Sequence, residues 1–195
     1  RVWDPWPIET IRLKYFDALL TSKESVESQS ISLYNIDEAA LQQGGQWPWP
    51  RQQLAELNRS FFEAGVGAIV YSALFPEEDR FGGDDEFAAS MLQLPTFLSA
   101  VATTDTDRQE GWHIGVATLG PVNENAVNYP GILPNVPTLQ DSATGTGIVN
   151  TAPEVDGLVR RVPMIVRVGE SLYPALGLDV LRGLAGDPSY QVRAG

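Results

Sequence analysis

The sequence lacks cysteine, contains a single histidine, and has only 13 Lys and Arg against 25 Asp and Glu. Without cysteine the chain forms neither a disulfide nor a thiolate metal site, and His113 alone is insufficient for a zinc site built on two histidines. The net charge of −12 repels a phosphate backbone, and no Lys/Arg cluster offsets that repulsion. We therefore expect no nucleic-acid partner and no metal.

Long apolar runs and nucleotide-binding fingerprints are also missing. No apolar stretch approaches the ~18 residues that span a bilayer. The glycines of "GVGAIVYS" lead into an expected strand instead of opening a helix, and neither GxxxxGK[ST] nor G-x-S-x-G occurs. We expect no cofactor and no catalytic residue, and we interpret His113 as a strand residue with a local hydrogen bond. Because the chain begins at Arg1 and ends in a polar tail, we expect it to be excised from a larger protein, without a signal peptide at its start.

What is present indicates one folded domain rich in turns. A chain of 195 residues that is 43% hydrophobic is long enough to bury one sizeable core, and 18 Gly with 14 Pro suggest many ordered turns. We predict a single α/β domain over residues 1–195, with a mixed central β-sheet flanked by helices and with long ordered loops.

Apolar periodicity and Gly/Pro punctuation predict the elements. The expected helices cover residues 3–20, 50–65, 84–94 and 173–184, and the expected strands cover 31–36, 66–75, 96–104, 111–119, 146–151 and 157–169. Residues 31–75 read as strand, helix and strand, which is typical of a parallel crossover. Residues 120–147 are expected to be ordered loops that allow a short helix near 136–143. A hairpin across 152–157 is one way of joining the two strands beside it.

The acid pair Asp37 and Glu38 follows the first expected strand, and ligands of α/β sheets gather outside the carboxyl ends of strands. Two interpretations are open. In the first, Asp37 caps the short helical turn that follows and Glu38 lies in its first turn. In the second, the pair contributes to a functional site. That site either binds a ligand or, as a less favoured interpretation, uses one of the two acids as the general base of a hydrolase.

The segment "QWPWPR" fixes its tryptophans between two prolines. Trp47 and Trp49 are expected to alternate inward and outward, so that at least one anchors the segment to the core and the other is available to line a cleft. Arg51, at the start of a helix, opposes the helix dipole and should therefore have a carboxylate partner, with Asp37 or Glu38 as candidates.

Two further charged segments need partners or solvent. The acidic runs "PEEDR" and "DDEF" lack the spacing of a calcium-binding loop, so we interpret them as solvated surface. The stretch "NTAPEVDGLVRR" places Asn150 and Asp156 in a turn, with Arg160 and Arg161 on opposite faces of the next expected strand. One of the arginines must point inward and should pair with an acid.

These segments resemble the CHASE2 sensory domain of bacterial receptors. The similarity rests on "WDP", "NIDEAAL", "GQWPWPR", "AGVGAIVYSALFPEEDR", "DDEFAASM", "GIVNTAPEVDGLVRRVPM" and "YPALGLDVLR", in this order along nearly the whole chain. The resemblance implies an extracytoplasmic sensor, on the periplasmic or extracellular side of the membrane, held between an N-terminal transmembrane helix and C-terminal ones. It also implies a cytoplasmic cyclase or kinase as output domain. Where members of the family commonly have Phe-Asp, this chain has Tyr71 and Ser72, so an acid that contributes to a shared site would be lost here.

We predict that a polar cluster of Asp37, Glu38, Arg51, Asp156 and Arg161 either binds a small ligand or latches two segments of the chain together, and we favour the latch. Trp47, Trp49, Ser72 and Asn150 complete the candidate site. The expected partners are an unidentified small-molecule ligand or stress signal, a second copy of the chain in a homodimer, and the membrane through flanking segments. The alternative function is architectural, as a dimerisation or docking domain.

Overall fold

The computed structural model describes residues 6–24, 28, 30–106, 112 and 115–193. The chain divides into two compact units, which are described separately below. Unit 1 comprises residues 1–47 and 152–161, and unit 2 comprises residues 48–151 and 162–195. Among the described residues, no helix combines the length and the apolar content that a membrane span requires.

Unit 1 contains two helices, α1 (Trp6–Thr21) and α2 (Glu38–Gly44). The helix α1 confirms the first predicted helix. The strand predicted at 31–36 is wrong, because these residues pair with no strand of the described chain, and Ile31, Leu33 and Tyr34 are exposed. A β-branched and aromatic composition favours a strand only where a neighbouring strand supplies the ladder. The parallel crossover predicted to begin here is therefore also wrong.

Unit 2 contains the sheets and the remaining helices. The elements are α3 (Arg51–Glu63), β1 (Ile69–Tyr71), α4 (Asp84–Met91), β2 (Thr96–Thr103), β3 (Gly115–Leu119), α5 (Val122–Asn125), β4 (Val127–Tyr129), β5 (Gly131–Leu133), α6 (Pro137–Ser142), β6 (Gly145–Ile148), β7 (Ile165–Val168), β8 (Ser171–Pro174), α7 (Leu176–Ala185) and β9 (Ser189–Arg193). Together they confirm the α/β class.

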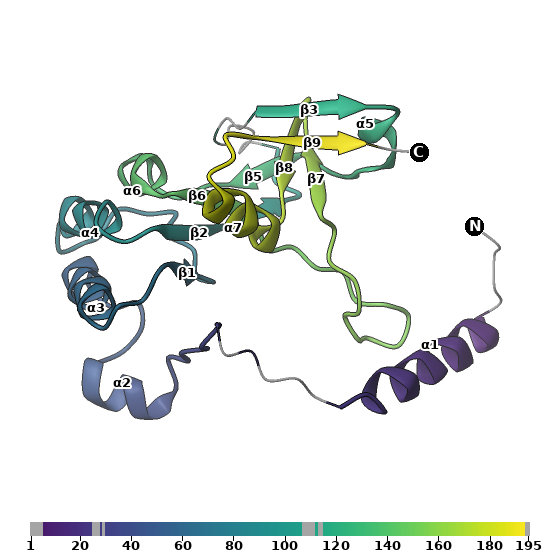
Figure 1. Ribbon diagram of the computed structural model, residues 1–195, viewed down its shortest axis with the longest axis horizontal. Helices are drawn as coiled ribbons and strands as arrows, with labels where there is room; N and C mark the ends of the chain where they lie inside the picture. Colours follow the sequence, from purple (N-terminus) through teal and green to yellow (C-terminus); the bar gives the residue numbers. More distant parts are fainter. Residues whose placement is uncertain (1–5, 25–27, 29, 107–111, 113–114, 194–195) are drawn as a thin grey trace. The chain divides into compact units, whose positions relative to one another are not determined.

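The main sheet is mixed, as predicted, and β2 is its central strand. β1 and β6 pair with β2 in parallel, and β5 pairs with its carboxyl-terminal half in antiparallel orientation (Figure 1). The parallel crossover is thus β1–α4–β2, and it begins at the strand with which the expected crossover ended. The helices α3 and α4 pack against each other, and α4 also contacts α6 (Figure 1).

Two smaller sheets hold the pairings that the sequence did not indicate. β7 forms its hairpin with β8 and pairs in parallel with β4, so the hairpin considered across 152–157 is wrong. The strand predicted over 157–169 is limited to β7. β3 pairs in parallel with β9, which occupies the polar tail, and the expected loop region 120–147 contains α5, β4, β5 and the start of β6 besides the predicted α6.

The helix α3 shows how local sequence fixes one element. Its end is a Schellman motif, in which the Gly65 amide donates to the Phe62 carbonyl at 3.0 Å and the Val66 amide donates to the Phe61 carbonyl at 3.0 Å. Gly65 has φ of +79°, a conformation that glycine adopts at little cost. The helix thus ends close to the predicted boundary at residue 65.

The apolar core of unit 2 contains two clusters on β2. The first packs Leu54, Phe75, Phe87, Met91 and Leu98 with their neighbours beneath α3, α4 and α6, and the second gathers residues from β2, β5, β6, β7 and β8. In the first cluster, Tyr71, Phe75 and Phe87 form three edge-to-face ring contacts with centroid separations of 5.5 to 5.8 Å.

A polar relay crosses the first cluster. The Tyr71 hydroxyl donates to the Asn58 carboxamide oxygen at 2.7 Å, and the Asn58 nitrogen donates to the Ser90 hydroxyl at 3.0 Å. Burial raises the pKa of Tyr71, so the phenol remains a neutral donor. The relay satisfies buried polar groups and joins α3, β1 and α4 in one arrangement.

Candidate functional site

The predicted site residues are divided between the two units. Asp37, Glu38, Trp47, Asp156 and Arg161 belong to unit 1, whereas Trp49, Arg51, Ser72 and Asn150 belong to unit 2. The polar cluster that would join them therefore stays a prediction. Within each unit, however, the structure assigns definite partners to most of these side chains. His113 lies outside the described residues.

Asp37 is the N-cap of α2, which confirms the first of its two interpretations. Its Oδ1 accepts a hydrogen bond from the Ala40 amide at 2.9 Å, and its backbone has the extended conformation of a cap residue. Glu38 follows in the first turn of the helix and is exposed. The acid pair thus starts a helix, where its negative charge complements the helix dipole.

Arg51 has the carboxylate partner that its position demanded, and that partner is Asp84. Arg51 Nε lies 3.3 Å from Asp84 Oδ1, and the two side chains are only 8% and 14% exposed. This separation makes an ion pair, although the groups are not aligned as a hydrogen bond. The guanidinium carbon also stacks 4.5 Å from the centre of the Phe75 ring, and Nη2 donates to the Glu77 carbonyl at 3.4 Å.

Asp79 organises the backbone around this ion pair. Its carboxylate accepts the backbone amides of Arg51 at 2.9 Å, Gly83 at 3.3 Å and Phe81 at 3.3 Å. Burial raises the pKa of Asp79, but these amides and the Arg51 charge outweigh it, so the pKa lies below its ordinary value. The interpretation of the acidic runs as solvated surface is therefore wrong for Asp79 and Asp84, which fix the start of α3 against the start of α4.

Trp49, Asn150 and Ser72 have different surroundings. Trp49 is half-buried and packs against the first core cluster, which confirms that at least one tryptophan anchors the segment. Asn150 extends the β2–β6 ladder by one step, because its side chain accepts the Ala102 amide at 2.7 Å and donates to the Ala102 carbonyl at 2.8 Å. Ser72 is exposed directly after β1.

In unit 1 the strongest charged junction belongs to Arg160 instead of the predicted Arg161. Arg160 binds Asp17 of α1 through two hydrogen bonds of 2.6 and 2.7 Å, and binds Asp156 through two more of 2.6 and 2.8 Å. The paired guanidinium holds the pKa of Asp17 below its ordinary value and that of Asp156 at about 2. Arg161 is largely exposed and contacts Glu154 at 3.3 Å.

This arrangement corrects the expectation that the two arginines occupy opposite faces of a strand. Residues 157–163 form no strand, and Arg160 reaches across to a helix more than 140 positions earlier in the chain. One of the acids that pair with the inward arginine comes from α1.

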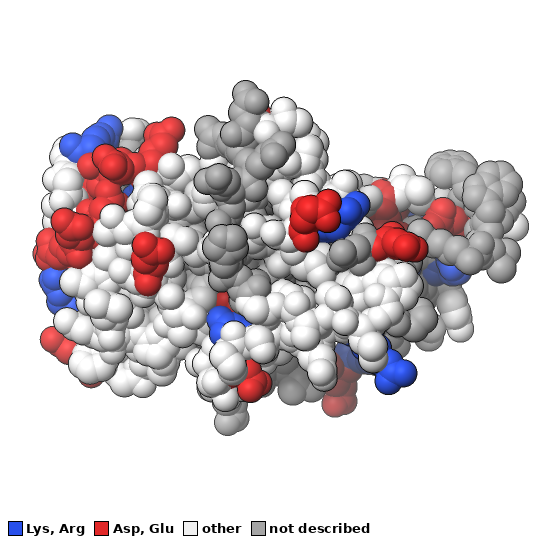
Figure 2. Space-filling view, turned by 90° about the horizontal axis from the view of Figure 1, so that it is seen from above, with Lys and Arg blue, Asp and Glu red and all other residues white. Residues whose placement is uncertain are grey.

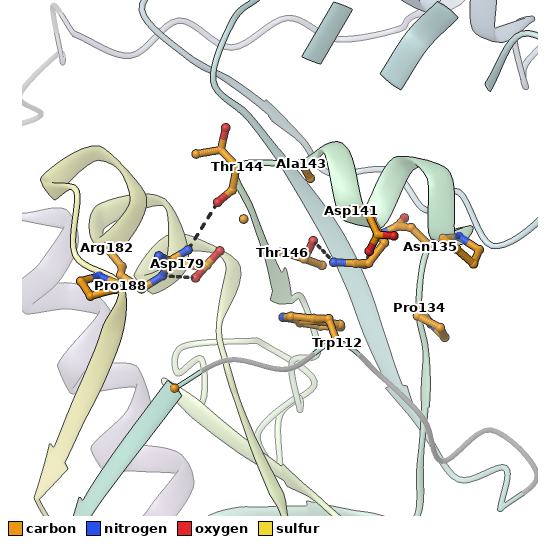
Figure 3. A pocket seen from close by; sticks show the side chains of 14 residues that line it. Trp112, Pro134, Asn135, Asp141, Ala143, Thr144, Thr146, Asp179, Arg182 and Pro188 are labelled. Atoms are coloured by element: carbon orange, nitrogen blue, oxygen red, sulfur yellow. Dashed lines mark hydrogen bonds and ion pairs between the residues drawn. The ribbon is translucent and has the colours of Figure 1, made fainter. Parts of the chain in front are cut away.

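A pocket of about 660 Å³ lies in unit 2, a volume typical of small-molecule sites. It is lined by residues of three segments: Trp112 and Gly115, then residues between Pro134 and Thr146, and finally Asp179, Arg182 and Pro188. Figure 3 shows Asp179 and Arg182 on one side, Asn135 and Asp141 on the other, and Thr144, Thr146 and Trp112 between them.

Asp179 is the unusual group of this pocket, because it is an acid that is 0% exposed in the first turn of α7. Its Oδ1 accepts hydrogen bonds from Arg182 Nε at 2.8 Å and from the hydroxyl of Tyr190 on β9. Burial and the neighbouring carboxylate raise the pKa of Tyr190, which keeps its proton on the phenol. The buried acid thus connects the pocket lining to β9.

The opposite side of the pocket is a chain of amides and hydroxyls. Gln140 Nε2 donates to the Thr146 hydroxyl at 2.7 Å, and Asn135 Nδ2 donates to the Gln140 carboxamide oxygen at 3.4 Å and to the Ser99 carbonyl at 3.1 Å. Asn135 also accepts the Phe75 amide at 3.1 Å. These bonds orient the polar lining and join it to β2.

The sequence did not single out the pocket residues. Asp179 lies next to the apolar repeat of Leu176, Val180 and Leu184, and Arg182 three positions later is the one local sign of a paired acid. No local sequence feature indicates that Asp17 forms an ion pair, since its partner comes from a distant segment.

Comparison with known families decides the identity of the fold. The CHASE2 domain model matches residues 2–192 of the 195-residue chain. This chain belongs to the CHASE2 domain family. CHASE2 domains are extracytoplasmic sensory domains of membrane receptors and are not catalytic. No curated protein and no solved structure matches the chain.

Proposed function

We propose that this CHASE2 domain detects a stimulus outside the cytoplasm and regulates a cytoplasmic output domain of a bacterial membrane receptor. The output domain is a nucleotide cyclase, a diguanylate cyclase, a histidine kinase or a Ser/Thr kinase. The single observation that carries this proposal is the family match over residues 2–192. Membrane attachment through flanking segments, and a small ligand or stress signal as stimulus, belong to the same proposal.

The Arg160 junction supports a regulatory role for unit 1. A sensor needs an element with two arrangements whose balance the stimulus shifts. Arg160, Asp156 and Asp17 form a compact group in which one cation holds two carboxylates, one on α1 and one on the loop at 152–161. Exchanging such ion-pair partners changes the position of a helix while few other contacts are lost, so α1 is suited to transmit the signal.

The experiment uses the full-length parent receptor and measures the product of its output domain. We expect Arg160→Ala to change basal output at least several-fold, because α1 loses its charged anchor. Arg59→Ala is the matched control, since Arg59 forms an exposed ion pair outside the candidate site residues and its loss should change output less than twofold.

Two results would refute the proposal. One is a parent receptor whose output is unchanged when residues 6–193 are removed. The other is an alkaline phosphatase fusion within this domain that is inactive although the protein is expressed, since that enzyme requires an extracytoplasmic location to fold.

The apolar surface of α1 favours a second function, as a homodimerisation module. Ile8, Ile11 and Tyr15 are all exposed, and they recur at the i, i+3 and i+7 spacing of a helix–helix seam. Sedimentation equilibrium of the chain and of Ile11→Glu tests this function. A dimer that Ile11→Glu dissociates would support it, and a monomeric wild-type chain at high micromolar concentration would exclude it.

A further inference from the structure

The pocket of unit 2 contains two polar atoms that are buried and have no hydrogen-bond partner within the described chain. They are Asp179 Oδ2, an acceptor, and Trp112 Nε1, a donor. Buried carboxylate oxygens are nearly always paired, because leaving one desolvated without a donor is costly. Both residues line the pocket, so a bound molecule would satisfy these atoms once the two side chains turn toward it.

The fold makes room for this carboxylate. A Cβ added to Gly145 would lie 2.0 Å from Asp179 Oδ2, so any larger residue at position 145 would displace the acid. Arg182 and Tyr190 both bind Oδ1, so Oδ2 lies beside Gly145 of the lining without a donor among the described residues. The free oxygen is thus the result of a specific arrangement around Asp179.

The charge of the lining favours a cation. Asp141 and Asp179 contribute two carboxylates, and Arg182 is the one basic residue among the lining residues. Arg182 is already engaged by Asp179 and by the Asp187 carbonyl at 2.7 Å, which leaves a net negative lining. Acidic side chains also outnumber basic ones on the face shown in Figure 2, in agreement with the net charge of −12.

The polar lining indicates that the cation also carries hydroxyl groups. Asn135, Gln140, Thr144 and Thr146 offer amides and hydroxyls, which bind both donors and acceptors. A volume of about 660 Å³ accommodates a molecule of the size of a monosaccharide with room for water. Trp112 supplies a donor and a flat ring surface of the kind that packs against sugar rings.

We propose that this pocket binds a small polyhydroxylated amine, such as an amino sugar, whose ammonium group donates to Asp179 Oδ2 while its hydroxyl groups bind Trp112 and the Gln140–Thr146 side. This inference rests on the proposed sensory function and names the class of ligand that the domain detects. The same carboxylate binds Tyr190 on β9 through its other oxygen, so a ligand that draws Asp179 toward the pocket also acts on β9.

The test compares four probes of one shape: glucosamine, glucose, N-acetylglucosamine and glucuronate. Isothermal titration of the 195-residue chain at about pH 6 gives the affinities, and the indole N–H resonance of Trp112 reports the site. We expect glucosamine to bind at least tenfold more tightly than the two neutral probes, to shift the Trp112 resonance, and to be favoured over glucuronate by a larger factor. Equal affinity for glucose and glucosamine, or no binding of glucosamine, would overturn the proposal.

Variants assign the binding to the carboxylate. Asp179→Asn should reduce glucosamine affinity at least tenfold and leave the weak affinity for glucose unchanged. Asp85→Asn is the control, because it removes the same charge from α4, outside the pocket lining. If Asp179→Asn does not fold, Asp141→Asn and Gln140→Ala replace it, and each should weaken glucosamine binding at least threefold. Undiminished affinity in these variants would overturn the proposal.

The failures of the two proposals are distinguishable. If glucosamine binds as described but leaves the output of the parent receptor unchanged, the pocket assignment stands and the proposed sensory role of this site fails. If no probe binds while Arg160→Ala still changes receptor output, the sensory function stands and the ligand class is wrong.

Discussion

Replacing Arg51 by alanine tests the physical basis of the junction between α3 and α4. The substitution removes a guanidinium that lies 3.3 Å from Asp84 and stacks on Phe75, in a place where the two charged side chains are 8% and 14% exposed. Water therefore has little access to the carboxylate left behind. The backbone bond from residue 51 to Asp79 is retained, because it uses the amide alone.

The size of the effect follows from burial. Removing one partner of a buried ion pair costs about 3–5 kcal/mol, and a cation–π contact contributes about 0.5–2 kcal/mol. Because the Arg51–Asp84 pair is not aligned as a hydrogen bond, we take the lower end and expect a loss of about 3 kcal/mol in the free energy of unfolding. For a chain of this size, that corresponds to a decrease in Tm of roughly 6–12 °C.

Urea unfolding followed by circular dichroism measures this loss, and Arg59→Ala provides the control from the same helix. Arg59 lies 2.6 Å from Glu86, but these side chains are 42% and 43% exposed, so we expect a change within about 0.5 kcal/mol. Combining Arg51→Met with Asp84→Asn should recover at least half of the loss, because position 84 then carries no charge that lacks its partner. A loss for Arg51→Ala no larger than that for Arg59→Ala would refute the reasoning.

Two further predictions concern Asp156 and the glycines. Because the pKa of Asp156 is depressed to about 2, its contribution to stability is complete above its unfolded pKa of about 4 and disappears as the pH falls toward 2. A carboxyl NMR titration of Asp156 with a midpoint near 4 would contradict this pH dependence. Gly145→Ala should destabilise the chain by about 1–3 kcal/mol, because the added Cβ clashes with Asp179. Gly177→Ala should instead stabilise α7 by about 0.5–1 kcal/mol, because no atom lies within 4 Å of its added Cβ. Thermal unfolding distinguishes the two variants, and equal effects would contradict the packing around Asp179.

The parts of the fold that the sequence predicted are those whose signals are local. The helix α3 has a proline before it, apolar residues at helical spacing and a glycine at its end, all within 16 residues. Similarly, α4 begins with three acids at its positive end, and β2 is rich in apolar and small residues. Such signals need no knowledge of what each element packs against.

The errors arise where a residue's secondary structure or ion-pair partner depends on a distant segment of the chain. Residues 31–36 have a typical strand composition but no neighbouring strand in the described chain, whereas β9 lies in a polar tail and is a strand because β3 supplies its ladder. The same dependence on distant segments decides the partners of the candidate site residues. The need of Arg51 for an acid was predictable from the helix dipole, but the choice of Asp84 over acids nearer in sequence depends on the packing of α4 on α3.

The bond to the buried Asp179 carboxylate also decides how many further contacts the proposed ligand must make. Shifting a sensor from one arrangement to the other, from 1:99 to 99:1, requires about 5.5 kcal/mol of differential affinity. A hydrogen bond to a charged group contributes about 1.5–3 kcal/mol, so the bond to Asp179 alone is insufficient. At least one further contact, to Trp112 or to the Gln140–Thr146 side, must also form in one arrangement only. An amine without hydroxyl groups should therefore bind Asp179 but switch the receptor incompletely, and a polyhydroxylated amine should do both.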